Sequence, residues 1–289
     1  MRDIAPRRPA HRFTGRRHGS ATEFAAASAL IVVLTACGAE DTGPDEATEE
    51  NGDGGALSGE LTVMAAASLT DVFAEIAEDF QEQHPSVEIT FNFAGSSELA
   101  QQINSGAPAD VFAAANTSTM EQVVDGEGLD ARWAAEHGED GLVFATNTLQ
   151  IAVPPANPAG IESLSDLAGG DVQVAFCAEE VPCGSATATA LEASGLDITP
   201  VTYEEDVRSV LTKVEMDEVD AGLIYATDVI SAEGRVEGLD FPEAREAIND
   251  YPIGVLANSA APELAAAWVE AVSSAKGVAV LDDAGFGTP

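Results

Sequence analysis

The chain has 289 residues, and its 12 basic and 50 acidic residues give a net charge of −38. This length allows two domains of ordinary size, or one large domain, with a substantial buried core. So acidic a chain argues against nucleic acid and anionic membrane surfaces as partners, because both carry negative charge themselves.

The first 36 residues have the features of an export signal. Six arginines precede an apolar run over residues 24–35, which is too short to span a bilayer comfortably as a mature helix. The run ends in L-T-A-C-G, and small residues before Cys37 are typical of a bacterial lipobox. We therefore expect residues 1–36 to be a lipoprotein signal peptide, and Cys37 to carry a lipid that anchors the exported protein on the outer face of the cytoplasmic membrane. The alternative is an ordinary signal peptide with an incidental cysteine, and the arginine pairs leave both Sec and twin-arginine export open.

Residues 37–59 are acidic and rich in glycine, without apolar periodicity, which predicts a disordered tether. The folded part is then expected to begin near Glu60. Residues 37–289 hold 6 of the 12 basic and 48 of the 50 acidic residues, so their net charge is −42. Only His84 and His137 remain there, both in polar surroundings, and we expect surface histidines rather than metal ligands or catalytic bases.

Strand-like and helix-like segments alternate from Glu60 onward. A helix is indicated where apolar residues from Leu69 to Phe80 recur with helical spacing, and a second helix opens at A-G-S-S, residues 94–97. Buried or alternating apolar runs predict strands at 61–66, 87–93 and 109–115. This βαβαβ order favours a mostly parallel sheet with helices on both faces.

The second half of the chain repeats this style. Strands are predicted at 149–153, 172–176 and 221–225, with one helix after the Cys183-Gly184 loop and another bearing Val207 to Val214. A strand at 251–256 is expected to return to the first unit, before a terminal helix over 262–274. We predict an α/β fold of two lobes, the second inserted into the first. Lobe 1 would hold residues 60–146 and 257–289, and lobe 2 residues 147–256.

Two cysteines remain if Cys37 is lipidated. Cys177 and Cys183 are six residues apart around a turn that contains proline, and in an exported protein this favours a small disulfide loop. Free thiols are the alternative. A zinc site is not expected, because no second Cys or His cluster accompanies the pair.

Small or polar residues mark four predicted strand-to-helix junctions, at Ser68, Ser96-Ser97, Cys183-Gly184 and Val207. Ligands of open α/β sheets bind beyond the carboxyl ends of the strands, where helix N-termini offer free N–H groups and a positive dipole end. Three of these junctions lack Lys and Arg, so together they favour an uncharged pocket of donors for an oxyanion. Taken alone, Ser68 with Asp71 also fits an ordinary helix cap.

Five motifs carry a resemblance to a known family. A-A-A-S-L-T-D, F-A-G-S-S-E-L-A-Q-Q-I-N-S-G-A-P-A-D-V-F, V-P-C-G, E-D-V-R-S-V-L and G-L-I-Y-A-T-D-V follow one another as in periplasmic molybdate-binding proteins of the ModA type, which the chain resembles from Leu61 onward. The resemblance implies a type II periplasmic-binding-protein fold with mixed, mostly parallel sheets and a ligand cleft between the lobes. It further implies high-affinity binding of molybdate, and of tungstate as a near-isosteric ligand, with delivery to the membrane permease of an ABC importer. We therefore expect no enzymatic activity, no cofactor, and a monomer.

The same resemblance assigns the oxyanion-binding residues. Ser68 and Ser96 would bind through hydroxyl and backbone N–H, Cys183 and Val207 through backbone N–H, and Tyr225 through its hydroxyl. Molybdenum would be held only as bound molybdate. Cys183 departs from the alanine frequent in the family, which a backbone donor tolerates, and pairing with Cys177 would stiffen the loop that aims this N–H. The expected roles of other polar residues are a helix cap for Ser97, an ion pair or interlobe contact for Arg208, and capping or hinge positions for Asp110 and Asp228.

Three other functions compete with this one. A receptor for sulfate or another tetrahedral oxyanion would have the same kind of pocket with a different size. A secreted hydrolase using Ser68 or Ser96 would need a histidine partner and a G-x-S-x-G elbow, and the sequence offers neither. A purely structural surface module would not need converging donor-rich junctions.

Overall fold

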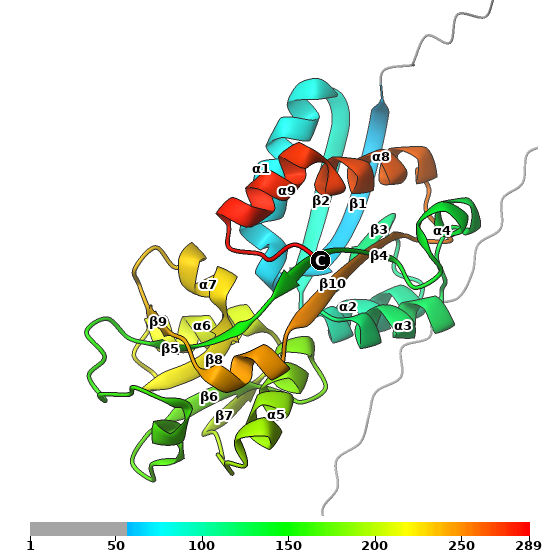
Figure 1. Ribbon diagram of the computed structural model, residues 1–289. Coiled ribbons are helices and arrows are strands. Elements are labelled where there is room, and N and C mark those ends of the chain that lie inside the picture. Colours follow the sequence, from blue (N-terminus) through cyan, green and yellow to red (C-terminus); the bar gives the residue numbers. More distant parts are fainter. Residues whose placement is uncertain (1–56) are drawn as a thin grey trace, which may run out of the picture. The chain divides into compact units, whose positions relative to one another are not determined.

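The computed structural model describes residues 57–289, so the expected signal peptide, the lipidation site Cys37 and nearly all of the expected tether lie outside the described residues. The described chain forms two five-stranded sheets, each flanked by helices (Figure 1). We call the first sheet with its helices lobe 1, and the second sheet with its helices lobe 2.

Lobe 1 has the strand order β2-β1-β3-β10-β4. Its first strand starts at Ser58 and pairs there with Ser86, so the fold begins two residues earlier than expected. Its strands are β1 Ser58–Ala66, β2 Ser86–Ala94, β3 Val111–Ala113, β4 Leu142–Asn147 and β10 Asn249–Val255. Its helices are a 3-10 turn Ala67–Leu69, α1 Thr70–Gln83, α2 Ser96–Asn104, α3 Thr117–Asp125, α4 Ala131–His137, α8 Pro262–Ser273 and α9 Ala275–Asp283.

Side-chain alternation explains why helices cover both faces of this sheet. On β1, Val63 and Ala65 face the core under α1 and α8, whereas Met64 faces the core under α2 and α3. Helix α1 buries the stripe expected from its spacing, and the ring of its Phe73 meets the Trp268 ring edge-on at 5.6 Å. A strand buried on both faces reads as a continuous apolar run, which is how residues 61–66 appear in the sequence.

Lobe 2 has the strand order β7-β6-β8-β5-β9. Its strands are β5 Leu149–Val153, β6 Val174–Cys177, β7 Thr202–Glu204, β8 Ala221–Tyr225 and β9 Glu237–Leu239. Its helices are α5 Pro182–Ser194, α6 Val207–Glu215 and α7 Ala226–Ser231, with 3-10 turns at Leu164–Ala168 and Pro242–Glu246.

The chain passes between the two sheets twice, from β4 to β5 through Thr148 and into β10 at Asn249 (Figure 1). Residues 249–255 therefore pair with the first sheet, so the expected end of lobe 2 at residue 256 is too late, although the predicted return of this strand is confirmed. The end of the chain is fastened beside the crossings, because Thr146 and Gly287 exchange two backbone hydrogen bonds of 2.8 and 2.9 Å.

Mixed sheets are confirmed, but parallel pairing does not dominate. In each sheet two strand pairs are parallel and two are antiparallel. The antiparallel pairs all contain β5 or β10, the strands that follow the two crossings. A strand entering from the other lobe is not constrained by the βα crossover that makes its neighbours parallel.

The predicted element boundaries hold closely at 149–153 and 221–225, and two differences affect function or fold. Helix α5 starts at Pro182, so Cys183 and Gly184 lie in its first turn rather than in a loop before it. A separate helix α9 follows α8 because the Ser274 hydroxyl caps it by accepting from the Gly277 N–H. Among residues 57–289, no single helix has the length and apolar character of a membrane span, although the bent pair α8 and α9 meets that criterion jointly.

Candidate functional site between the lobes

All five residues assigned to oxyanion binding line one pocket between the lobes, which we call the interlobe pocket. Ser68 and Ser96 come from lobe 1, and Cys183, Val207 and Tyr225 from lobe 2, each with at most 4% of its surface exposed. The volume open to the centres of water-sized spheres is about 20 Å³. One water needs roughly 10–15 Å³ on this measure, whereas pockets for organic ligands start near 300 Å³. The pocket therefore suits a compact inorganic ion.

Four helices begin at this pocket. These are α1 with the 3-10 turn before it, α2, α5 and α6. Side chains cap neither α1, α2 nor α5, so no side-chain acceptor competes for the first N–H groups of these helices. Unsatisfied N–H groups and aligned helix dipoles favour a bound anion at such a point.

Ser68 does not cap a helix, so that part of the sequence-based expectation is wrong. It lies inside the 3-10 turn, and the residue before α1 is Leu69, whose side chain cannot accept. The Ser68 hydroxyl instead lies 2.9 Å from the Tyr251 hydroxyl, both in the buried interior. Asp71, the expected capping partner, points outward with 63% of its side chain exposed.

The two serines that open α2 have different partners. The Ser96 hydroxyl oxygen accepts the Ala115 N–H at 3.0 Å, which joins the α2 start to the end of β3. The Ser97 hydroxyl donates to the Glu180 carbonyl at 2.7 Å and so links the two lobes. The expectation that Ser97 caps α2 is therefore wrong, because its hydroxyl bonds to lobe 2. Gly95 precedes them, and a Cβ there would lie 2.3 Å from the Glu205 carbonyl oxygen of lobe 2.

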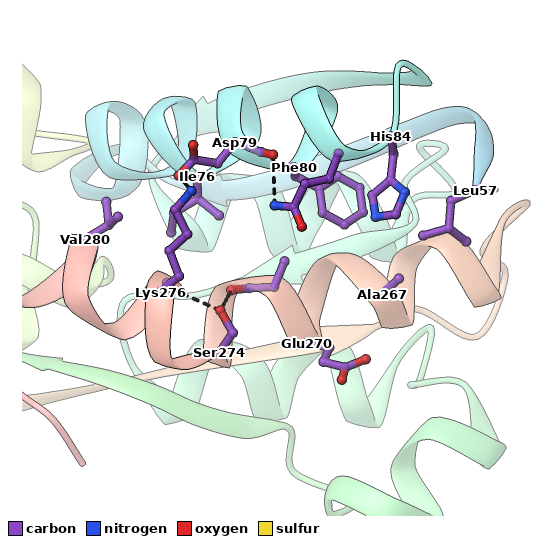
Figure 2. Close-up of a pocket in the computed structure, with 13 residues that line it drawn as sticks. Leu57, Ile76, Asp79, Phe80, His84, Ala267, Glu270, Ser274, Lys276 and Val280 are labelled. Carbon is purple, nitrogen blue, oxygen red and sulfur yellow. Dashed lines mark hydrogen bonds and ion pairs between the residues drawn. The ribbon is translucent and has the colours of Figure 1, made fainter. Parts of the chain in front are cut away.

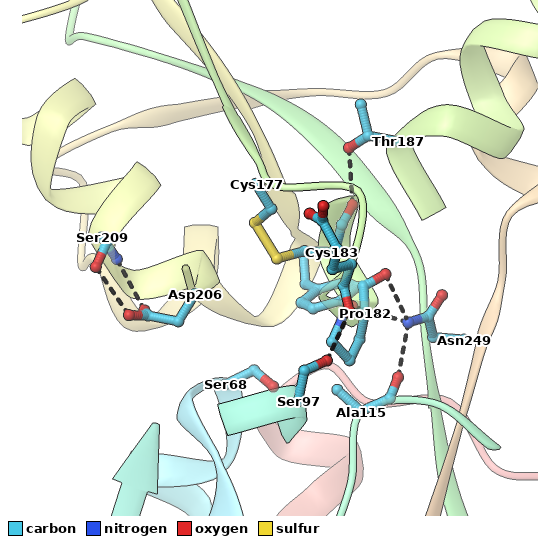
Figure 3. Close-up of a disulfide and its surroundings, with 12 residues drawn as sticks. Ser68, Ser97, Ala115, Cys177, Pro182, Cys183, Thr187, Asp206, Ser209 and Asn249 are labelled. Atoms are coloured by element: carbon cyan, nitrogen blue, oxygen red, sulfur yellow. Dashed lines mark hydrogen bonds between the residues drawn. A yellow bond between two sulfur atoms is a disulfide. The ribbon is translucent and has the colours of Figure 1, made fainter. Parts of the chain in front are cut away.

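The predicted disulfide between Cys177 and Cys183 is present, and it joins the end of β6 to the first turn of α5 (Figure 3). Pro182 has no N–H, so the Cys183 N–H is the first donor of this helix. Gly184 lies against the small loop closed by the disulfide, since a Cβ there would collide with the Ala178 carbonyl. These contacts tie the loop and the helix start together.

Two acidic residues, Glu205 and Asp206, lie beside Val207 at the pocket edge. The Asp206 carboxylate caps α6, accepting from the Ser209 N–H at 2.9 Å and from the Ser209 hydroxyl at 2.8 Å. Glu205 meets the opposite lobe with its backbone carbonyl. Lys, Arg and His are all missing from the described lining of this pocket.

Tyr225 ends β8 and is almost fully buried, with 1% of its surface exposed. Burial raises the pKa of its hydroxyl well above the usual value, and the nearby Tyr251 and Asp228 act in the same direction. The phenol therefore keeps its proton at physiological pH and can act as a donor. Its oxygen accepts a hydrogen bond of 2.8 Å from the Asn249 side chain.

Arg208 forms the expected ion pairs rather than lining the pocket. Its Nε lies 2.7 Å from the fully buried Asp228 carboxylate, and its terminal nitrogen lies 2.6 Å from Asp71 of lobe 1. Burial raises the pKa of Asp228 to about 7, although the Arg208 charge opposes this shift. Asp110 has a capping role, since one carboxylate oxygen accepts from the backbone N–H groups of Ala260 and Ala261 just before α8.

Sequence reasoning missed the residues that support the pocket from behind. Asn147, Tyr251 and Asn249 are buried and bond to Ser68 or Tyr225, directly or through one another. Tyr251 was read only as part of a strand. Asparagine is typical of turns, so neither asparagine carried a local signal, and only the crossing of the chain between lobes brings them here.

A larger hollow, which we call the outer groove, lies on lobe 1 between α1 and the α8–α9 pair (Figure 2). Its volume on the same measure is about 370 Å³, and it contains none of the predicted ligand residues. Across it, the Lys276 ammonium pairs with the Asp79 carboxylate at 2.6 Å. His84 lines this groove and His137 lies elsewhere on lobe 1; within residues 57–289 no cluster of three or more His, Cys, Asp or Glu could hold a metal ion.

Comparison with known proteins places the chain among binding proteins. The family described as "Bacterial extracellular solute-binding protein" matches residues 61–287. The molybdate-binding protein ModA of Mycobacterium tuberculosis is 40% identical over 260 residues, which cover 90% of this chain and 95% of that protein. An ABC-transporter substrate-binding lipoprotein of Bacillus subtilis is 27% identical, over 91% of this chain and 96% of that protein.

Solved structures agree on the fold. The periplasmic molybdate-binding protein of Azotobacter vinelandii matches with a TM-score of 0.67 at 18% identity, covering 79% of this chain and 99% of that one. The sulfate-binding protein SubI of Mycobacterium tuberculosis matches with a TM-score of 0.68 at 18% identity, covering 78% and 86%. At this identity the likeness shows the fold alone, the expected two-lobed binding-protein type.

Proposed function

Because the chain belongs to the bacterial extracellular solute-binding proteins, and among them to the ModA molybdate-binding proteins, we propose that it binds molybdate outside the cytoplasm and delivers it to an ABC importer. A family of solute-binding proteins carries out binding rather than catalysis, in agreement with the expectation that the chain is not an enzyme.

The observation that carries this proposal is the convergence of donors on the interlobe pocket. Hydroxyl groups of Ser68, Ser96 and Tyr225 and helix starts at Cys183 and Val207 surround about 20 Å³, without a basic side chain. A fully deprotonated tetrahedral dianion offers only acceptors, so its matching host offers N–H and O–H groups. Hydrogen bonds to an ionised partner are the stronger kind, and rigid backbone donors lose little entropy on binding.

Contacts between the lobes support retention of the anion. Three contacts join the lobes: Ser97 bonds Glu180, Arg208 pairs with Asp71, and Gly95 lies against Glu205, of which Gly95 and Glu205 line the pocket. An ion held there is covered on both sides, and the lobes must separate to release it. This opening is where an importer would act.

The overall acidity of the protein does not prevent anion capture. The screening length at about 0.15 M salt is roughly 8 Å, so surface carboxylates farther away than this act weakly on the pocket while its lining donors act directly. We expect affinity to stay the same or improve slightly as salt rises. A steep loss of affinity with salt would contradict a pocket of uncharged donors.

Tungstate is the second ligand that we propose, since it has the same charge and nearly the same size. We also propose that Cys37 carries a lipid anchor, supported by the L-T-A-C sequence and by the similar lipoprotein of Bacillus subtilis. Mass spectrometry of the membrane-extracted protein would test the anchor, and a Cys37→Ala variant should be released into the medium.

A calorimetric panel of molybdate, tungstate, sulfate and phosphate tests the proposed ligand. Ser68→Ala and Tyr225→Phe each remove one donor to a charged ligand, worth about 1.5–3 kcal/mol, so affinity should fall about 10- to 150-fold. Ser185→Ala and Tyr203→Phe are matched controls at exposed positions and should bind like wild type. Preference for sulfate over molybdate would favour the related oxyanion-receptor function, and no binding in the whole panel would refute both.

A further inference from the structure

Two buried asparagines lie where the chain crosses between the lobes. Asn147 ends β4, Asn249 begins β10, and the two are register partners in the antiparallel pair. They are 3% and 7% exposed. Buried amides at such positions must find partners, and each bonds to residues around the interlobe pocket.

Their neighbours fix which way each amide points. The Nδ2 of Asn249 lies 2.7 Å from the Ala115 carbonyl and 3.4 Å from the Pro182 carbonyl (Figure 3), and carbonyls can only accept. The Oδ1 of Asn147 accepts the Thr148 N–H at 3.0 Å, which leaves its Nδ2 facing the Thr227 hydroxyl at 2.8 Å and the Tyr251 hydroxyl at 3.4 Å. Both NH₂ groups therefore donate toward the pocket side.

These donations favour one arrangement of the hydroxyl protons. The Tyr225 oxygen accepts from Asn249 at 2.8 Å, so its one proton remains to be donated. The Tyr251 and Ser68 hydroxyls lie 2.9 Å apart, where either can donate, and the Asn147 Nδ2 lies 3.4 Å from the Tyr251 oxygen. The arrangement in which Tyr251 donates to Ser68 leaves the Ser68 proton for the pocket. Ser96 follows the same rule, because its oxygen accepts the Ala115 N–H.

We propose that Asn249 and Asn147 are positioning residues that hold the hydroxyls of Tyr225 and Ser68 as donors, so that the interlobe pocket selects fully deprotonated anions. This inference rests on the proposed oxyanion-binding function. A hydroxyl oxygen that already accepts one hydrogen bond, and whose proton points into the pocket, presents a donor rather than a lone pair to the ligand. A protonated anion such as hydrogenphosphate would therefore bury an unpaired O–H, which is costly.

A double-mutant cycle separates this role from a purely structural one. Asn249→Ala should weaken molybdate binding about 10-fold in the wild-type background, but less than about 3-fold in a Tyr225→Phe background, where no hydroxyl is left to orient. Asn147→Ala should show the same dependence on Ser68, measured with Ser68→Ala. Thr148→Ala is the matched control at the same crossing, since its hydroxyl makes only a 3.4 Å contact with Ala244.

The preference for deprotonated anions gives a second readout. In Asn249→Asp the new carboxylate would accept a hydrogen bond from the Tyr225 hydroxyl and turn its proton away from the pocket, so the ratio of molybdate to hydrogenphosphate affinity should fall at least 10-fold. If circular dichroism shows that the Asn249 variants do not fold, the double-mutant cycle of Asn147 with Ser68 tests the proposal instead. If the losses of affinity in both double-mutant cycles simply add, while the wild-type protein still binds molybdate, this inference alone is overturned. If the wild-type protein binds no oxyanion, the proposed function is overturned as well.

Discussion

The interlobe pocket and the outer groove are built from different chemical groups. The outer groove is far larger, about 370 Å³ against about 20 Å³, and contains a cation, Lys276. That cation is 63% exposed and already paired with Asp79, so it offers an anion little beyond what water does. Among residues 57–289, the lining of the interlobe pocket includes no charged donor, but its donors are buried and held by helix starts. The interlobe pocket therefore combines a small volume with preorganised neutral donors, and the proposed dianion site rests on this combination rather than on a charged side chain.

The largest expected effect is a loss of molybdate affinity when the contact between the two lobes at the interlobe pocket is blocked. The Cβ in Gly95→Ala would meet the Glu205 carbonyl at 2.3 Å and hold the lobes apart. Overpacking of this kind costs about 1–3 kcal/mol, so molybdate affinity should fall about 5- to 150-fold in a calorimetric titration. Gly170→Ala, where a Cβ meets nothing within 4 Å, is the control and should bind like wild type. Unchanged affinity in Gly95→Ala would mean that binding does not need the lobes in contact.

A separate effect concerns stability rather than affinity, namely the pH dependence that Asp228 produces behind the pocket. Its pKa is raised to about 7 by burial, against 3.8 for an ordinary aspartate, so the folded state keeps a proton that the unfolded chain has lost. The free energy of unfolding should therefore fall as pH rises from about 4 to 7, by at most about 1.4 kcal/mol per pH unit, and level off above pH 7. Urea denaturation across this range should show a shallower decline in Asp228→Asn. Parallel curves for the two proteins would contradict the assignment.

A smaller effect is expected from opening the disulfide at the pocket wall. Cys177→Ser should lower the free energy of unfolding by about 2 kcal/mol, because the closed loop is short. It should also weaken molybdate binding several-fold, since the loop that aims the Cys183 N–H gains freedom. Reduced wild-type protein should behave like the variant. Unchanged affinity in both would show that helix α5 alone fixes this donor.

The smallest effect is expected in the outer groove itself. Lys276→Ala removes the exposed pair with Asp79 and should change the free energy of unfolding by about 0–1 kcal/mol. Molybdate affinity should not change. A loss of affinity comparable to that of Tyr225→Phe would show that the groove communicates with the pocket, and the contrast between the two regions would have to be given up.

Local patterns predicted those parts of the site that depend on one strand-to-helix junction. Ser68, Ser96, Cys183 and Val207 each end a predicted strand or begin a predicted helix, and the structure brings them together with Tyr225. The family resemblance supplied their specific assignment. The disulfide followed from spacing and export, and Arg208 formed the ion pairs expected of it.

The hydrogen bonds that the sequence could not predict are those between residues far apart in the chain, most of them in different lobes. The Ser97 hydroxyl was expected to stay within its own helix, yet it bonds Glu180, a residue 83 positions away. Asn249 bonds one residue that follows β3, one that begins α5 and one that ends β8, and no short window of sequence contains all of them. The strand at 251–256 showed that the chain returns to lobe 1, but not that Tyr251 would bond Ser68.

The fastening of the chain end to Thr146 has a practical consequence for reporter design. Gly287 is hydrogen-bonded to Thr146, and Thr146 immediately precedes Asn147 at the crossing between the lobes. A fluorescent protein fused after Pro289 would therefore begin close to this crossing. Paired with a dye on an exposed lobe 2 position such as Tyr203, it would form a resonance-energy-transfer gauge for the ligand. A purification tag at this end would lie beside the same crossing and could disturb the movement of the lobes. Binding measurements are therefore better made on protein without a C-terminal tag.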